Sequence, residues 1–292
     1  MALSIQTNYT SMLTQDKLTS SNKALSIAMQ RLSTGFRINS AADDAAGLQI
    51  ATRLQAQVGG QTTAIRNAQD AISMLQTGEG ALNEFSNIVL RMKDLATQAA
   101  NGTNSSDDGT ALDAEYQQLA GELNNIMGNT SYGSGTKLLA DGTGKFDDVV
   151  TFQIGSSTAE TLDVDVSAEI GDINDAITAT TTPGPPPVTT SPLGAIDDQD
   201  GATDAMDALD DLLDKVGTAR ASFGAYMNRL DHTVNNLTNM KENTAAAKGR
   251  ITDADYAEEA SSMTKQQLLM QTGMSVLSNS NQIGSLVTSL LR

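Results

Sequence analysis

One sequence feature constrains this chain more than any other: apolar residues recur at alternating spacings of three and four along a proline-free stretch. From Leu54 to Ala99 they follow this pattern through more than six heptads, and polar residues interrupt it only twice. A heptad repeat of this length predicts one continuous helix, over about 42–100, that packs against a partner along a single seam. A second seam, from Met206 to Leu237, is the expected antiparallel partner.

Shorter elements lie between the two seams. A helix is expected over about 110–127, after the turn-rich loop 101–109. Apolar and polar residues alternate on both sides of a short turn within 148–166, which predicts a β-hairpin that caps the helices. All five prolines lie between Pro183 and Pro192 and cannot continue a helix. This stretch is therefore expected to be an exposed tip or a linker.

Composition excludes several classes of protein. The chain has no Cys, no Trp and one His, so disulfides, thiolate metal sites and cysteine nucleophiles are impossible. Histidine chemistry would depend on His232 alone, and no convergent set of titratable groups is visible. We therefore expect a non-enzyme with no cofactor and no metal. No run of 18 apolar residues could span a bilayer, and the N-terminus shows no secretory signal peptide.

The net charge of −17 is concentrated in the middle of the chain. Residues 141–215 contain 17 of the 35 acidic residues but only two of the basic ones, whereas both ends are nearly neutral. No basic stripe is present to contact phosphates, so nucleic acid is not expected as a partner. An acidic segment of this kind is typical of a solvated surface.

Two similar joints separate the ends of the chain from its middle. Each has a glycine, then Arg-Ile, then a hydroxyl residue with an aspartate three positions later, which predicts helix N-caps at Ser40 and Thr252. The candidate joint and capping residues are Arg37, Ser40, Asp43, Arg250, Thr252 and Asp255. The arginines Arg31, Arg37 and Arg250 are expected either to pair with Asp43, Asp44 or Asp253 or to remain solvated.

The segments outside the joints, 1–34 and 254–292, are similar in length, and each has an uncharged periodic face. Neither segment could bury this face alone, because short isolated helices are marginal in water. We expect the two segments to lie side by side and to add to a neighbouring copy. The candidate self-assembly residues are Leu18, Leu25, Leu32, Leu269, Val276, Ile283, Val287 and Leu290.

Two segments resemble the signatures of a known family. Residues 30–51 begin Gln30-Arg-Leu-Ser-Thr-Gly, and residues 250–259, followed by Met263 and the Ser289-Leu-Leu-Arg292 end, form the second segment. They are similar to the two signatures of bacterial flagellin, the subunit of the flagellar filament, and the resemblance covers roughly 1–168 and 203–292. It implies a mainly α fold, with long antiparallel coiled-coil helices forming a rod, a small β-hairpin region and a short variable outer insert.

The resemblance also implies an order of domains. The expected parts are an inner-tube helix 1–44 that pairs with 250–292, a middle rod domain 45–168 with the hairpin 148–166, a variable Pro-rich outer insert 169–202, and the C-terminal helix of the rod domain 203–249. A flagellin would polymerise into the propeller for swimming. The alternative is a flagellin-like junction protein between hook and filament, which would form only short rings.

The implied partners are further copies of the chain, a flagellar export chaperone, and the cap and junction proteins. The implied location is the extracellular flagellum, reached by type III export without a cleaved signal peptide. No insertion into a membrane is expected. Host innate immune recognition by the animal Toll-like receptor of flagellin is a further implied property.

Two sets of surface residues follow from the resemblance. The segment that the receptor reads aligns with 89–96, where Arg91 and Leu95 keep the family pattern, and a glutamate of the next helix aligns with Glu115. The candidate receptor residues are Leu90, Arg91, Asp94, Leu95 and Glu115. O-linked sugars, which flagellins often carry on the outer domain, would be expected on Thr180, Thr181, Thr182, Thr189, Thr190 and Ser191.

Overall fold

The computed structural model describes residues 8–178, 180–182, 188–190 and 193–290, with backbone alone at 180–182, 188–190 and 283–290. The chain divides into two compact units, Met1–Val58 with Glu242–Arg292 and Gly59–Lys241, which we call the terminal unit and the middle unit. Both boundaries fall inside long helices, α2 (Ala45–Ala99) and α5 (Gln199–Thr252). Apart from the outer insert, the finer domain limits expected from the sequence stay predictions.

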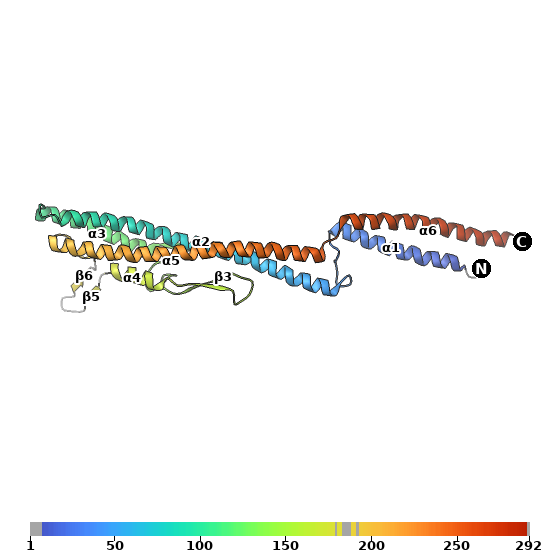
Figure 1. Cartoon of the computed structure of the whole chain (residues 1–292), viewed down its shortest axis with the longest axis horizontal. Helices are drawn as coiled ribbons and strands as arrows, with labels where there is room; N and C mark the ends of the chain where they lie inside the picture. Colours follow the sequence, from blue (N-terminus) through green and yellow to red (C-terminus); the bar gives the residue numbers. More distant parts are fainter. Residues whose placement is uncertain (1–7, 179, 183–187, 191–192, 291–292) are drawn as a thin grey trace. The chain divides into compact units, whose positions relative to one another are not determined.

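In the terminal unit, α1 (Tyr9–Thr34) and α6 (Tyr256–Leu290) lie side by side (Figure 1). The side chain of Asn8 caps α1 by accepting from the Ser11 backbone N–H at 3.0 Å. Gly273 of α6 meets Leu18 of α1 so closely that a Cβ added to the glycine would lie 3.3 Å from the Leu18 Cγ. The small residue therefore lets the two helices approach.

The main apolar core lies in the middle unit, where α2, α3 (Ser106–Asn129), α4 (Ser167–Ile177) and α5 bury one contiguous cluster. The seam predicted for α2 is confirmed, since Leu75, Leu82 and Phe85 are fully buried. The rings of Phe146 and Phe223 meet edge to face with their centroids 5.0 Å apart. The predicted heptad positions thus became the core of this unit.

Two ion pairs give the relative direction of α2 and α5. Glu79 of α2 pairs with Arg220 of α5 at 2.9 Å, and Lys93 of α2 pairs with Asp210 of α5. Residue numbers rise along α2 as they fall along α5, so the helices are antiparallel. The expected fold class, mainly α with long helices and a small β-hairpin region, is confirmed.

The described strands form three antiparallel pairs. These are β1 (Ser131–Tyr132) with β2 (Thr136–Lys137), β3 (Val150–Gln153) with β4 (Thr161–Val164), and β5 (Thr180–Thr182) with β6 (Val188–Thr190). The β3–β4 pair confirms the hairpin predicted within 148–166. It packs on the helices through the buried Leu162 and Val164, and Asn67 of α2 donates to the Gln153 carbonyl at 3.0 Å.

The structure corrects the expectation that all of residues 169–202 form an outer insert. Helix α4 packs into the core through Ile170, Ile173 and Ile177, and the core also buries Leu193 and Ile196. The reason is a short apolar face at spacings of three and four inside a segment whose acidic and proline-rich composition concealed it. Helix α5 also begins earlier than expected, at Gln199.

Candidate functional site

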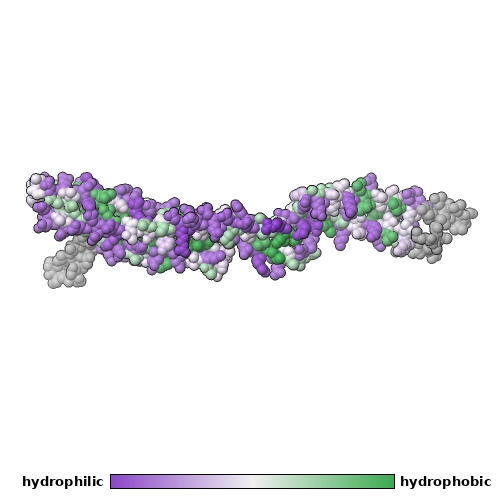
Figure 2. Space-filling model, in the orientation of Figure 1, coloured by the Kyte–Doolittle hydropathy of each residue, from purple (hydrophilic) through white to green (hydrophobic). Residues whose placement is uncertain are grey.

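The terminal unit leaves most of its large apolar side chains exposed. Of the fifteen such residues exposed in the described part of the chain, twelve lie in this unit and three in the middle unit. We call the twelve residues the terminal apolar surface; they are Tyr9, Met12, Leu13, Ile27, Met29, Phe36, Ile50, Tyr256, Leu268, Leu269, Met274 and Val276. Figure 2 shows apolar residues at the surface over α1 and α6 on the face that it displays.

The predicted self-assembly residues fall on two different sides of the helix pair. Leu25 is only 6% exposed and Leu18 lies against Gly273, so these α1 positions hold the pair together. For the buried Leu25, the prediction of a contact with a neighbouring copy is wrong. Leu32 is half-buried, whereas Leu269 and Val276 of α6 are 48% and 46% exposed. The side chains of Ile283, Val287 and Leu290 lie outside the described ones.

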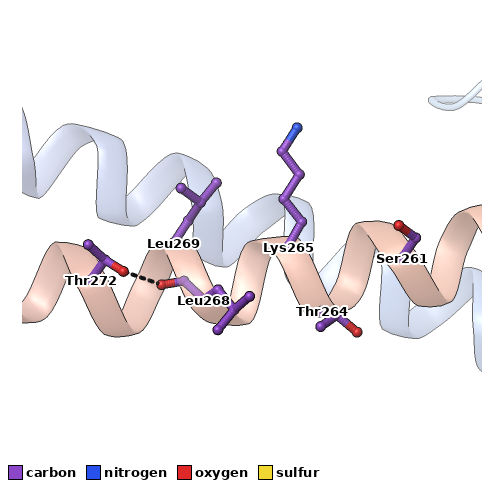
Figure 3. A pocket seen from close by; sticks show the side chains of 6 residues that line it. All are labelled: Ser261, Thr264, Lys265, Leu268, Leu269 and Thr272. Carbon is purple, nitrogen blue, oxygen red and sulfur yellow. Dashed lines mark hydrogen bonds between the residues drawn. The ribbon is translucent and has the colours of Figure 1, made fainter.

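An open hollow follows the outer side of α6 (Figure 3). Its lining comes entirely from this one helix and consists of Ser261, Thr264, Lys265, Leu268, Leu269 and Thr272. Leu268 and Leu269 are both about half exposed here, and the Thr272 hydroxyl donates to the Leu268 carbonyl at 2.8 Å. Because its hydroxyl is bonded within the helix, Thr272 adds little polarity to the hollow. The apolar strip bounded by Lys265 is therefore covered by no other element among the described residues.

The two joints are hydrogen-bonded to each other within the terminal unit. Phe36 and Asp253 form an isolated antiparallel β-bridge, with the Arg37 N–H donating to the Thr252 carbonyl at 2.7 Å and the Ala254 N–H donating to the Gly35 carbonyl at 2.9 Å. The Arg37 guanidinium adds a bond to the Ile251 carbonyl at 2.9 Å. The similarity of the joints in sequence therefore corresponds to direct pairing in space.

The predicted N-caps at Ser40 and Thr252 are wrong. The Asp43 carboxylate accepts from the Asn39 and Ser40 N–H groups and from the Ser40 hydroxyl, which closes a turn before α2 starts. Donation from Ser40 holds the pKa of Asp43 below its usual range. The Asp44 carboxylate then caps α2 by accepting from the Gly47 N–H at 2.8 Å.

The second joint behaves in the same way. Thr252 is the last residue of α5, and its hydroxyl donates to the Lys248 carbonyl at 3.1 Å. Asp255 caps α6 by accepting from the Ala257 N–H at 2.8 Å. At both joints a carboxylate is the acceptor at the helix start, and the hydroxyls of Ser40 and Thr252 donate hydrogen bonds instead of accepting them.

The ion pair at the joints is also different from the predicted ones. Arg31 pairs with Glu259 at 3.0 Å rather than with Asp43, Asp44 or Asp253. The sequence held a signal for this pair, since Arg31 lies in the last turn of α1 and Glu259 in the first turn of α6. Among the described residues, Arg250 forms no ion pair.

The receptor candidates are only partly available at the surface. Arg91 of α2 pairs with Glu115 of α3, with an Nη2–Oε1 distance of 2.7 Å, and Leu90 beside them is 51% exposed. Asp94 is also exposed. Leu95 is only 2% exposed because it packs in the core, so its candidacy as a contact residue is wrong.

The predicted glycosylation sites lie where no side chain is described. Thr180, Thr181, Thr182, Thr189 and Thr190 lie in β5 and β6, where only the backbone is described, and Ser191 lies outside the described residues. None of the described helices is long and apolar enough to cross a membrane. Within the same residues, no three His, Cys, Asp or Glu side chains gather as a metal site.

Known proteins resemble the chain over most of its length. Residues 5–143 match the bacterial flagellin N-terminal helical region, and residues 206–291 match the bacterial flagellin C-terminal helical region. The chain is 35% identical to polar flagellin F of Vibrio parahaemolyticus over 381 aligned positions that cover 100% of both proteins. It is 40% identical to a flagellin of Halalkalibacterium halodurans over 266 positions, 91% of each.

A solved structure adds a likeness of fold alone. It is described as a flagellar hook-associated protein from Vibrio parahaemolyticus, and it matches with a TM-score of 0.55 and 17% identity over 72% of this chain and 100% of that one. The two matched helical regions together span well over half of the sequence. The chain belongs to the bacterial flagellin family, whose members are structural subunits of the flagellar filament.

Proposed function

We propose that the terminal apolar surface is the face through which this filament subunit contacts its neighbours. The chain is a structural subunit that polymerises with copies of itself into the flagellar filament. The observation that carries the proposal is the location of twelve of the fifteen exposed large apolar residues in the terminal unit. Large exposed apolar patches mark surfaces that associate.

The position of the α6 residues supports a repeated contact. Leu269 and Val276 are seven residues apart and both exposed. A spacing of seven is that of equivalent heptad positions, which pack against a second helix. We expect Ile283, Val287 and Leu290 to continue this seam. Each copy would offer one surface and receive another, and contacts of this head-to-tail kind build an open helical polymer.

The test is polymerisation of a subunit with a polar α6 strip. A Leu268→Ser, Leu269→Ser double variant should fail to form filaments in electron micrographs at concentrations where the unchanged subunit forms them. Its circular dichroism should stay the same, because both side chains are exposed in the single chain. Leu90→Ser is the matched control in the middle unit, since Leu90 is 51% exposed. Normal filaments from the double variant would overturn the proposal.

A second candidate function is that of a ligand for the animal flagellin receptor. The observation that favours it is the exposed cluster of Leu90, Arg91 and Glu115, contributed by two helices of the middle unit. In reporter cells that carry the receptor, Arg91→Ala should lower the response to purified subunit, and Asp148→Ala, an exposed change outside α2 and α3, should not. Equal responses from both variants would sink this function.

The remaining partners follow from the family alone. We propose an export chaperone and the cap and junction proteins as partners. We also propose that the chain is exported by the type III route without a cleaved signal peptide and that it has no enzymatic activity. Polymer length separates a filament subunit from the alternative junction protein, because a junction protein would form only short rings. Mass spectrometry of filaments sheared from cells tests the export route, which predicts an uncleaved N-terminus.

A further inference from the structure

The methionines of this chain differ widely in exposure. The sequence contains 12 Met and no Cys, so methionine carries all of its sulfur. In the terminal unit, the side chains of Met12, Met29 and Met274 are 58%, 47% and 56% exposed. In the core of the middle unit, Met74, Met92 and Met127 are at most 8% exposed.

The exposed terminal methionines belong to the terminal apolar surface defined above. Met12 shares the outer side of α1 with Tyr9, three residues before it, and with the adjacent Leu13, which is four residues from Tyr9. Met274 is an exposed residue of α6, and at two residues from Val276 it lies on a different side of that helix. A chemical change at these sulfur atoms would therefore alter the polarity of three of the twelve residues of the terminal apolar surface.

We propose that Met12, Met29 and Met274 are oxidation sites whose conversion to methionine sulfoxide prevents the free subunit from polymerising. The inference rests on the assembly surface proposed above. The oxidant is a peroxide: a lone pair of the thioether sulfur attacks one peroxide oxygen, the O–O bond breaks and an S–O bond forms. The departing hydroxide takes the proton of the transferred hydroxyl group, so that sulfur is oxidised by two electrons and hydrogen peroxide is reduced to one molecule of water.

The sulfoxide blocks assembly because it is polar. A thioether fits apolar contacts and adapts to their shape, whereas a sulfoxide oxygen buried between subunits would need a hydrogen-bond donor that an apolar contact lacks. The buried Met74, Met92 and Met127 are shielded from the oxidant. The middle unit therefore keeps its fold while the terminal unit loses the ability to associate.

The reaction is also reversible. Methionine sulfoxide reductases return each sulfoxide epimer to the thioether, so an oxidised subunit can regain its assembly surface. Within the polymer the same sulfur atoms are expected to be covered. The switch therefore acts on subunits before they are incorporated and leaves incorporated subunits protected.

Treatment of the purified subunit with hydrogen peroxide tests the proposal. Peptide mass spectrometry should find sulfoxide at Met12, Met29 and Met274 well before it appears at Met74, Met92 or Met127. The critical concentration for polymerisation should rise at least about tenfold, which corresponds to about 1.4 kcal/mol of contact free energy. Reduction with the two sulfoxide reductases should restore the original value.

Two variants sharpen the test. A Met12→Leu, Met29→Leu, Met274→Leu variant should polymerise equally well before and after peroxide. Met240→Leu is the matched control, because Met240 is 42% exposed but lies in the middle unit, and it should remain as sensitive as the unchanged subunit. Normal polymerisation of a subunit with sulfoxide at all three sites would overturn the inference. If the Leu268→Ser, Leu269→Ser variant still fails to polymerise, that normal polymerisation would contradict only the oxidation inference, and the proposed assembly surface would stand.

Discussion

Arg31, in the last turn of α1, donates through Nη1 to the Glu259 carboxylate in the first turn of α6 at 3.0 Å. The two side chains are only 30% and 13% exposed. Each charge also complements the dipole of its own helix end, since Arg31 lies near a C-terminus and Glu259 near an N-terminus. This pair therefore fastens the two helices of the terminal unit beside the joints.

Removal of the Glu259 charge should loosen the α1–α6 pair. Glu259→Gln leaves the half-buried Arg31 guanidinium, whose Nε already lacks a partner among the described residues, without its counter-charge. We expect a loss of about 1 to 3 kcal/mol, measured as faster amide hydrogen exchange along α1. The control is Glu115→Gln, which removes an ion pair whose side chains are 56% and 48% exposed and should change stability by less than about 1 kcal/mol. Equal effects of the two changes would contradict this role for Arg31 and Glu259.

Gly35 is required by the backbone at the end of α1. Its φ of 76° is in the left-handed region, and a Cβ at this position would lie 3.3 Å from the Tyr256 hydroxyl. Gly35→Ala should therefore destabilise the terminal unit by about 1 to 2 kcal/mol, as seen in thermal unfolding. Gly80→Ala in α2 is the opposite case, because its Cβ would meet nothing within 4 Å, and it should stabilise the middle unit by about 0.5 to 1 kcal/mol. A neutral Gly35→Ala would show that the joint can adopt another conformation.

The start of α3 should depend on pH. The Ser105 hydroxyl and N–H both donate to the Asp108 carboxylate, and the Asp108 N–H donates back to the Ser105 hydroxyl. These bonds, the hydroxyl first, hold the pKa of Asp108 below its ordinary value of 3.8. A lowered pKa in the folded state contributes stability that is fully present above pH 3.8 and is lost as the pH falls through the lower value.

Nuclear magnetic resonance can follow this loss as fraying of the first turn of α3 in acid. Asp108→Asn should remove the pH dependence at this helix end while α1, whose cap is the uncharged Asn8, serves as the internal control. A first turn that stays ordered below the folded-state pKa of Asp108 would contradict the prediction.

The contact between Phe146 and Phe223 should contribute strongly to the stability of the middle unit. Both rings are fully buried, and the edge of each lies near the backbone of Gly78. Phe223→Ala should lower the free energy of unfolding by about 3 to 5 kcal/mol through lost burial and a new cavity, measured by urea titration. Met240→Ala, at an exposed position of the same helix, should have a much smaller effect. An effect of Phe223→Ala as small as that of Met240→Ala would contradict the prediction and would show that the core collapses around the missing ring.

Much of the fold could be predicted because its pattern is local. The seam from Leu54 to Ala99 became α2, and the alternation within 148–166 became β3 and β4. Helix α4 was missed because its three isoleucines span barely two turns between acidic and proline-rich neighbours. The burial of Leu95 could have been predicted, because Leu95 lies three residues after Met92 of the seam. Its alignment with the segment that the receptor reads suggested instead that Leu95 is exposed.

The sequence by itself determined that this chain forms long helices, that similar joints separate its two ends from its middle and that its charge lies in the middle, because periodicity and composition require no knowledge of distant contacts. The tertiary structure alone decided which terminal side chains are buried between α1 and α6 and which remain exposed. It placed Leu25 inside and Leu269 outside, and it joined Arg31 to Glu259. The physical reason is that a helix pattern gives the face of each helix, whereas the rotation of one helix against another depends on close contacts such as that of Gly273 with Leu18.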